Sequence, residues 1–189
     1  ASMLDTETAN EISLLDPGAG IGSLFTAVVE HCCLQDQKPR LIKVTAYEIE
    51  PLLLDYLKDT VRLCESVCKD YTIEFHAEIR EEDFVASTLS TLKPIFFDSS
   101  SALFTHAILN PPYHKIPSKS STRMMLSSVG IETSNMYTAF LSLTSMLLVN
   151  SGQMVSITPR SFCNGPYFRP FRKFFIRSMN IERLHLFQS

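Results

Sequence analysis

The stretch Leu15-Asp16-Pro17-Gly18-Ala19-Gly20-Ile21-Gly22-Ser23 links a short apolar run, residues 12–15, to a segment whose apolar residues recur at helical spacing. Glycines at such a turn let the backbone come close to a bound ligand. The stretch therefore predicts a strand, a Gly-rich loop and a helix, in that order. The helical spacing is carried by Leu24, Phe25, Val28 and Cys32.

Strand and helix patterns alternate along the rest of the chain. Strands are predicted over residues 44–49, 72–76, 107–109, 152–158 and 181–187, and helices from Pro51 onward and over 136–149. The first of these helices has an apolar stripe made of Leu53, Leu57, Val61, Cys64 and Cys68. The alternation predicts an α/β fold, with an open, mostly parallel sheet and helices on both faces.

Ligands of such sheets bind at the carboxyl ends of the strands, near the point where the strand order reverses. Polar residues follow four of the predicted strands, so the functional site is expected at Asp16, Glu48, Asp83 and Asn110. The Ser- and Lys-rich segment between Tyr113 and Met136 is too long for a plain connector, and we expect it to act as a lid or binding loop.

Composition limits the class of protein. With 189 residues, 45% of them apolar and 20% charged, the chain is expected to form one globular domain, residues 1–189. No apolar run approaches the roughly 20 residues that cross a bilayer, and the amino terminus has no signal segment. The five cysteines are odd in number and lack zinc-site spacing, so we expect no metal site and a reduced, cytoplasmic protein. Cys64 and Cys68 are expected in the core.

The net charge of -3 conceals an uneven distribution. Residues 1–104, the acidic half, carry 8 Lys and Arg against 18 Asp and Glu. Residues 105–189, the basic half, carry 9 Lys and Arg against 2 Asp and Glu. The basic half predicts a surface that faces a polyanion, with solvated helix faces as the alternative interpretation.

The Gly-rich stretch also narrows the class of ligand. The dinucleotide fingerprint needs a third glycine three residues after the second, where Ser23 or Phe25 stands, and the Gly-Lys-Ser/Thr of a phosphate loop is absent. The carboxylate of Asp16 suits a ligand with an ammonium group better than a pyrophosphate. S-adenosylmethionine has an ammonium group, a sulfonium cation and no phosphate, so it is the predicted cofactor.

Two acidic motifs follow the next strands. Glu48, in Tyr47-Glu48-Ile49-Glu50, is expected to accept hydrogen bonds from both ribose hydroxyls of the cofactor, with Glu50 as the alternative. Asp83, in Glu82-Asp83-Phe84, is expected to accept from the adenine amino group of the cofactor, and Phe84 is placed with the cofactor-binding residues.

The tetrapeptide Asn110-Pro111-Pro112-Tyr113 is the most specific signal, since chance gives such a string in on the order of one chain in a thousand of this length. Two prolines after a strand fix the backbone and remove two N–H donors. The Asn110 side-chain carbonyl and the Pro111 backbone carbonyl can accept both hydrogens of a planar amine, while Tyr113 stacks on its ring. The nitrogen lone pair can then attack a sulfonium methyl group, so these four residues are predicted to be catalytic.

At these motifs the sequence resembles the amino-group DNA methyltransferases, specifically the adenine-N6 enzymes in which the cofactor motif precedes Asn-Pro-Pro-Tyr. The resemblance covers nearly the whole chain, and residues 130–140 and 157–169 resemble the restriction-modification branch. It implies that Asp16, Gly18 and Gly20 hold the methionine end of S-adenosylmethionine, Glu48 the ribose and Asp83 the adenine amine. Residues 110–113 would hold a flipped adenine of double-stranded DNA, with no metal needed for methyl transfer.

The resemblance further implies a Rossmann-like, seven-stranded sheet with a late antiparallel strand, expected to be incomplete at both ends of this chain. An amino-terminal cofactor motif, a second aromatic that sandwiches the base, and an attached recognition domain or nuclease are expected outside residues 1–189. Other classes stay open. They are an oxidoreductase, disfavoured by the missing glycine, a catalytically silent DNA-binding module, and an rRNA or protein-glutamine methyltransferase with the same tetrapeptide.

Overall fold

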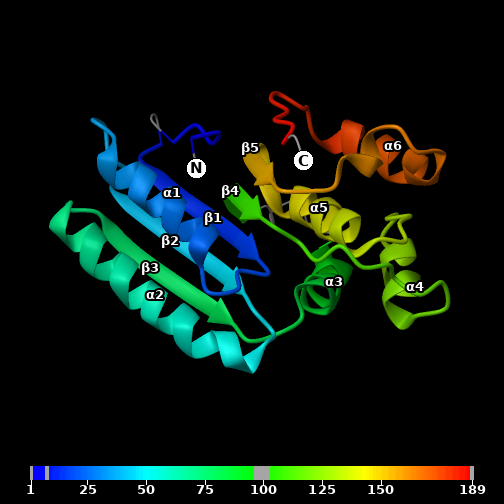
Figure 1. The fold of residues 1–189 in the computed structure, drawn as a ribbon, viewed down its shortest axis with the longest axis horizontal. Helices are drawn as coiled ribbons and strands as arrows, with labels where there is room; N and C mark the ends of the chain where they lie inside the picture. Colours follow the sequence, from blue (N-terminus) through cyan, green and yellow to red (C-terminus); the bar gives the residue numbers. More distant parts are fainter. Residues whose placement is uncertain (1, 7–8, 96–102, 188–189) are drawn as a thin grey trace.

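The computed structural model describes residues 2–6, 9–95 and 103–187. Within them, five parallel strands form one sheet in the order β3-β2-β1-β4-β5 (Figure 1). The predicted α/β fold is therefore confirmed. The strands are β1 (Glu11–Pro17), β2 (Leu41–Tyr47), β3 (Glu74–Arg80), β4 (Phe104–Leu109) and β5 (Leu148–Ser156). The helices are α1 (Ser23–Leu34), α2 (Pro51–Asp70), α3 (Phe84–Ile95), α4 (Ser121–Ser128), α5 (Met136–Leu147) and α6 (Arg169–Ser178), with the 3₁₀ turns η1 (Arg160–Cys163) and η2 (Pro166–Phe168).

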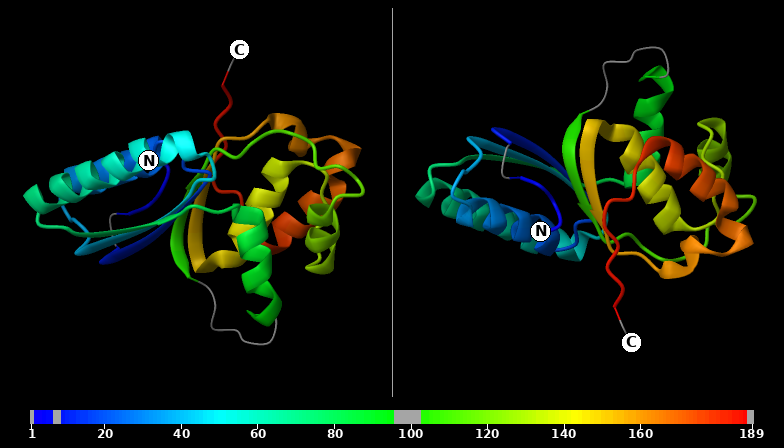
Figure 2. Two further views of the ribbon diagram at one scale, coloured as in Figure 1. Left: turned by 90° about the horizontal axis from the view of Figure 1, so that it is seen from below. Right: turned by 90° about the horizontal axis from the view of Figure 1, so that it is seen from above.

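Helices cover both faces of the sheet, as predicted (Figure 2). Successive strand residues point to opposite faces, so Leu14 packs in the layer of α1 and α2, whereas Leu15 packs in the layer of α3 to α6. Cys64 and Cys68 are 2% and 0% exposed, which confirms them as core residues of α2. None of the described helices combines the length and apolar character needed to cross a bilayer.

Element boundaries differ modestly from the predicted ones. The strand β2 begins at Leu41, because Leu41 and Ile42 already pair with Glu11 and Ile12 of β1. The helix α2 does start at Pro51, but its buried stripe begins with Leu54, and Leu53 is only half-buried. The predicted stripe was wrong by one residue at that end.

The predicted strand over residues 181–187 is wrong. This segment has no regular secondary structure, and its apolar side chains are exposed, with Phe187 81% exposed. A strand is held by hydrogen bonds to a neighbour, and among the described residues β5 pairs only with β4, which leaves this segment without a partner.

The segment between Tyr113 and Met136 contains a packed helix. The side chain of Ser120 caps α4 by accepting from Arg123 N at 3.2 Å, and Leu126 and Ile131 are 0% and 1% exposed. An isolated antiparallel bridge joins Lys115 to Asn135 at the base of the segment. The segment is therefore anchored in the core, and its role as a lid stays a prediction.

Candidate active site at the carboxyl ends of the strands

The strand order reverses between β1 and β4, so the switch point of the sheet lies between their carboxyl ends. Asp16 is the penultimate residue of β1, and Asn110 directly follows β4. Glu48 directly follows β2, and Asp83 comes three residues after β3. The four polar residues singled out in the sequence thus lie along one edge of the sheet.

The Gly-rich loop is fixed to the end of β2. Gly18 N and Ala19 N both donate to Tyr47 O, at 2.9 and 2.8 Å. Gly18, Gly20 and Gly22 have φ values of +78°, +60° and +89°, a region that side chains disfavour. A Cβ atom on Gly22 would lie 2.5 Å from the Phe25 ring, whereas one on Gly20 would meet nothing within 4 Å. Gly22 is therefore required by packing, and Gly20 borders open space in which a ligand can approach the backbone.

The carboxylate of Asp16 is buried without a partner. Its side chain is 0% exposed, and neither oxygen accepts a hydrogen bond from any described residue. Desolvation raises its pKa to about 7, and the negative charge of Glu48 acts in the same direction. The backbone N–H of Phe25 in α1 acts in the opposite direction and only partly offsets the effect of burial. A buried carboxylate in this state favours a cationic ligand, which would supply the missing partner.

Glu48 holds the loop in place. It is 8% exposed, and its Oε2 accepts from Gly20 N at 2.8 Å. Its Oε1 accepts from Ile49 N and Glu50 N at 2.8 and 2.7 Å. The alternative residue, Glu50, is exposed, and its side chain accepts from Leu52 N, at 3.4 Å, as the N-cap of α2. Of the two glutamates, Glu48 is the one directed toward the Gly-rich loop.

Asp83 and Phe84 begin α3. Asp83 is exposed and its Oδ1 caps the helix by accepting from Ala86 N at 2.7 Å, which leaves Oδ2 available to another donor. Phe84 is 3% exposed and packs edge-on against Tyr47, with ring centroids 5.1 Å apart. Both residues therefore have structural roles beside the cofactor roles predicted for them.

The Asn110-Pro111-Pro112-Tyr113 tetrapeptide leads out of β4 into solvent. Asn110 is exposed, Pro111 is buried and Pro112 is exposed. Tyr113 is 49% exposed, and its single hydroxyl hydrogen is shared between two acceptors, Asn110 Oδ1 at 2.5 Å and Ile157 O at 3.1 Å. Partial burial raises the pKa of Tyr113 above its usual value, so this hydroxyl stays protonated and serves as a donor. The Asn110 carbonyl is thus held as an exposed acceptor beside an exposed aromatic ring.

Two aromatic residues of α5 border the site and were not predicted. Phe140 lies beside the Gly-rich loop, 3.7 Å from the position of a Cβ on Gly18, and its ring centroid is 5.0 Å from that of Phe84. Tyr137 packs edge-on against Tyr113 at 6.2 Å. Both belong to Met136-Tyr137-Thr138-Ala139-Phe140, a stretch in which periodicity indicated only a helix.

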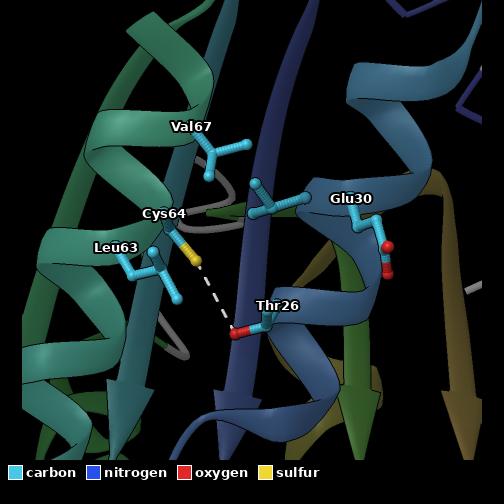
Figure 3. A pocket seen from close by; sticks show the side chains of 6 residues that line it. Thr26, Glu30, Leu63, Cys64 and Val67 are labelled. Atoms are coloured by element: carbon cyan, nitrogen blue, oxygen red, sulfur yellow. Dashed lines mark hydrogen bonds between the residues drawn. The ribbon is translucent and has the colours of Figure 1, made fainter. Parts of the chain in front are cut away.

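A groove of about 260 Å³ lies elsewhere, between α1 and α2 (Figure 3). It is lined by Thr26, Val29, Glu30, Leu63, Cys64 and Val67. Thr26 Oγ1 and Cys64 Sγ are 3.6 Å apart across it. This apolar groove sits between two helices and contains none of the residues at the strand ends, so we do not assign the chemistry to it.

The two halves of the chain differ in how their charges are paired. Among the described residues, all six ion pairs join side chains within residues 11–81, in the acidic half. In the described part of the basic half, no Lys or Arg forms an ion pair with a carboxylate. Its cations are Lys115, Lys119, Arg123, Arg160, Arg169, Arg172, Lys173, Arg177 and Arg183.

Comparison with known proteins agrees with this geometry. Residues 42–189 match the family described as Eco57I restriction-modification methylase. The chain is 39% identical over 179 residues to the type II methyltransferase M.PstI of Providencia stuartii, and 41% identical over 195 residues to the type II methyltransferase M.BsuBI of Bacillus subtilis. These matches cover 95% and 100% of this chain but 34% and 37% of the relatives, so the chain spans about a third of their length.

A crystal structure from Listeria monocytogenes, described as a class I S-adenosylmethionine-dependent methyltransferase, has a similar fold. The TM-score is 0.61 over 90% of this chain and 46% of that one, at 14% identity. At this identity the likeness establishes the fold alone, which is Rossmann-like and of the class I methyltransferase type.

Proposed function

Because this chain belongs to the Eco57I restriction-modification methylase family, we propose that it is the catalytic core of an enzyme that methylates the N6 amine of adenine in double-stranded DNA. A methylase family and a class I methyltransferase fold together point to S-adenosylmethionine as the methyl donor. The adenine target and the duplex substrate are our proposals. The observation that carries them is the exposed Asn110 carbonyl held beside the Tyr113 ring at the switch point of the sheet.

The residues present fit the cofactor. The unpartnered, buried carboxylate of Asp16 matches an ammonium group, and the loop around Gly20 leaves open space next to its backbone. In this proposal Glu48 and the Asp83 Oδ2 oxygen accept from hydroxyl and amino donors of the cofactor, and Gly18 and Phe84 belong to the same part of the site. When bound, S-adenosylmethionine supplies an electrophilic methyl group on a sulfonium cation.

Asn110, Pro111 and Tyr113 act on the target base. Two carbonyl acceptors, Asn110 Oδ1 and Pro111 O, accept hydrogen bonds from the two N–H groups of a planar amine, so the nitrogen lone pair is less delocalised into the ring. Pro112 keeps the backbone of the turn fixed, because its ring restricts φ. Tyr113 provides a stacking face for the base, which an enzyme must first take out of the duplex. No strong base is needed before transfer, and the nitrogen passes one proton to solvent water after the methyl group is attached.

A nucleic-acid substrate is supported by the charges. The basic half contains nine Lys and Arg but only two acidic residues, and its described cations form no ion pair. Phosphate contacts supply most of the non-specific affinity of DNA-binding proteins, and they are made by Lys and Arg side chains. A protein-glutamine substrate offers no comparable negative charge. The pairing pattern therefore favours nucleic acid over the protein alternative, while rRNA remains an outcome of the experiment.

The experiment uses the full-length protein, labelled S-adenosylmethionine and duplex DNA of mixed sequence, with the methylated nucleoside identified after digestion. We expect N6-methyladenine, and we expect Asn110→Ala to lower turnover roughly 100-fold, the size seen when one transition-state hydrogen bond is removed. Cofactor affinity should stay within about twofold, because Asn110 is not expected to contact the cofactor.

Asn150→Ala is the matched control, since Asn150 is also exposed but lies inside β5, away from the site. It should leave turnover unchanged. Near wild-type turnover of Asn110→Ala on DNA would contradict the amine-acceptor role, and label found in rRNA or protein rather than DNA would establish the alternative substrate.

A further inference from the structure

The segment Ile157–Arg169, which follows β5 and contains η1 and η2, is bound directly to the candidate active site. Ile157 O accepts from the Tyr113 hydroxyl at 3.1 Å. Further along, Ser161 Oγ lies 3.3 Å from Tyr137 OH, and the Phe168 ring packs against Tyr137 with centroids 5.9 Å apart. Because Tyr137 in turn contacts Tyr113, the segment and the catalytic tetrapeptide form one connected structure.

Helix α6 packs against the same segment and holds its backbone by hydrogen bonds. Arg172 Nη1 donates to Phe162 O at 2.8 Å and to Gly165 O at 2.7 Å. Phe162 also packs edge-on against Phe171, which is 2% exposed. A backbone held by a guanidinium and a buried ring keeps its shape without a partner bound, so the outward side chains of the segment are presented in a defined arrangement.

Those outward side chains combine positive charge with an aromatic ring. Arg160 and Arg169 are exposed, and Tyr167 is 62% exposed. The acidic residues of the basic half are Glu132 and Glu182, and neither pairs with these arginines in the described structure. Exposed arginines beside an exposed aromatic ring are the combination with which proteins bind phosphates and unstacked bases.

We infer that Ile157–Arg169 is a docking surface for the DNA strand next to the target adenine, with Arg160 and Arg169 on backbone phosphates and Tyr167 stacked on a base exposed when the target is extruded. The inference rests on the proposed function, because the segment is attached to Tyr113. In this inference the DNA lies at the carboxyl ends of β4 and β5. It is next to the candidate active site and does not cover the Gly-rich loop. Arg172 is a positioning residue of this surface.

Salt dependence of binding tests the arginines. Affinity of the full-length protein for a mixed-sequence DNA duplex would be measured by fluorescence anisotropy at several salt concentrations. Each phosphate contact contributes about 0.9 to the slope of log affinity against log salt. Arg160→Gln and Arg169→Gln should each reduce the slope by about that amount, and the double variant by about twice as much.

The matched control removes two positive charges from the acidic half. Lys43 and Lys69 are exposed there, on β2 and at the end of α2. The double variant Lys43→Gln/Lys69→Gln loses the same charge as the arginine pair, yet its slope should equal that of the wild type. An equal reduction in both double variants would overturn the inference, because the effect would then reflect total charge rather than this surface.

Tyr167 has a separate signature. Tyr167→Ala should weaken binding at least about fivefold without changing the salt slope, because stacking releases no counterions, and Tyr167→Phe should bind like the wild type. Unchanged affinity of Tyr167→Ala would overturn its stacking role.

Methyl transfer by the wild type on the same duplex separates the two proposals. If the wild type methylates DNA but the arginine variants keep its salt slope, the docking surface is wrong and the proposed function stands. If the wild type neither binds nor methylates DNA, the proposed function fails. If the arginine variants change subunit association or thermal stability and not the salt slope, the surface contacts protein, which also overturns the inference.

Discussion

The acidic and basic halves of this chain both contribute strands to the carboxyl-end side of the sheet, but they differ in how their charged side chains are paired. In the acidic half, several exposed carboxylates form ion pairs, as where Arg40 bridges Glu11 of β1 and Glu74 of β3. Among the described residues of this half, Asp16 is the one carboxyl group that is buried without a hydrogen-bond partner. In the basic half, cations such as Arg160 and Arg169 are left without carboxylate partners.

This difference suits a cationic ligand at the buried carboxyl group of the acidic half and a polyanion at the basic half. A single carboxylate in a dry site recognises one small cation strongly, because burial removes the competing water. Dispersed, solvated cations recognise a polyanion, because each one displaces a counterion from it. The cofactor and the nucleic acid would therefore meet at the boundary between the halves, where β1 and β4 are neighbours.

The largest expected effect concerns Asp16 in the cofactor-free protein. Its pKa is about 7 when folded and near 3.8 ordinarily, so between these values the folded chain binds a proton that the unfolded chain has lost. The contribution of this group to stability is complete below pH about 4 and is lost as pH rises to about 7. The free energy of unfolding should fall by up to about 1.4 kcal/mol per pH unit over that range.

Urea denaturation of the wild type and of Asp16→Asn at pH 5, 6, 7 and 8 measures this effect, because other carboxylates cancel in the difference. The Asn variant should gain stability relative to the wild type as pH rises, and the gain should level off above pH 7. S-adenosylmethionine should bind the wild type more tightly as pH rises toward 7 and should bind Asp16→Asn weakly at every pH. A stability difference that is constant from pH 5 to 8 would show that Asp16 is already ionised in the folded protein.

The next effect separates the two glutamates after β2. Glu48→Ala should weaken cofactor binding by about 1 to 3 kcal/mol, because it removes an acceptor and leaves polar groups unpaired. Glu50→Ala should change cofactor affinity by less than about twofold and cost only a helix cap, roughly 0.5 to 1 kcal/mol of stability. Calorimetric titration at a temperature where both variants are folded makes the comparison. Equal losses of affinity would remove the distinction between Glu48 and Glu50.

The positions of Asp16, Glu48 and Asn110 could be predicted because local signals define strand ends. A Gly-rich loop, a proline at the first turn of a helix and a pair of prolines each interrupt a strand at a fixed residue. The helices α3, α4 and α6 were not predicted. In α6, Phe171, Phe174 and Phe175 have the spacing of a helical face, but Arg172 and Lys173 stand between them and mask the apolar periodicity in the sequence.

The remaining site residues depend on tertiary contacts. Phe140 lies beside Gly18 although 121 residues separate them, and Ile157 enters the site through its backbone oxygen, which no side-chain pattern encodes. The wrong prediction of a strand over 181–187 also comes from tertiary contacts, because a strand forms only where a partner strand is available.

The smallest expected effect tests whether ion pairing in the acidic half is needed for stability. Arg40 joins two carboxylates across three strands, but its side chain is 56% exposed and those of Glu11 and Glu74 are each 50% exposed. Solvent and salt screen such pairs, which are typically worth less than about 1 kcal/mol. Arg40→Gln should therefore lower the free energy of unfolding by less than about 1 kcal/mol at low salt and by less still in 1 M NaCl, as measured by urea denaturation. DNA affinity and its salt slope should stay at wild-type values, because Arg40 is already paired with two carboxylates and lies in the acidic half. A reduced salt slope in Arg40→Gln would mean that DNA also contacts the β1 and β3 side of the molecule, and the division of ligands between the two halves would be wrong.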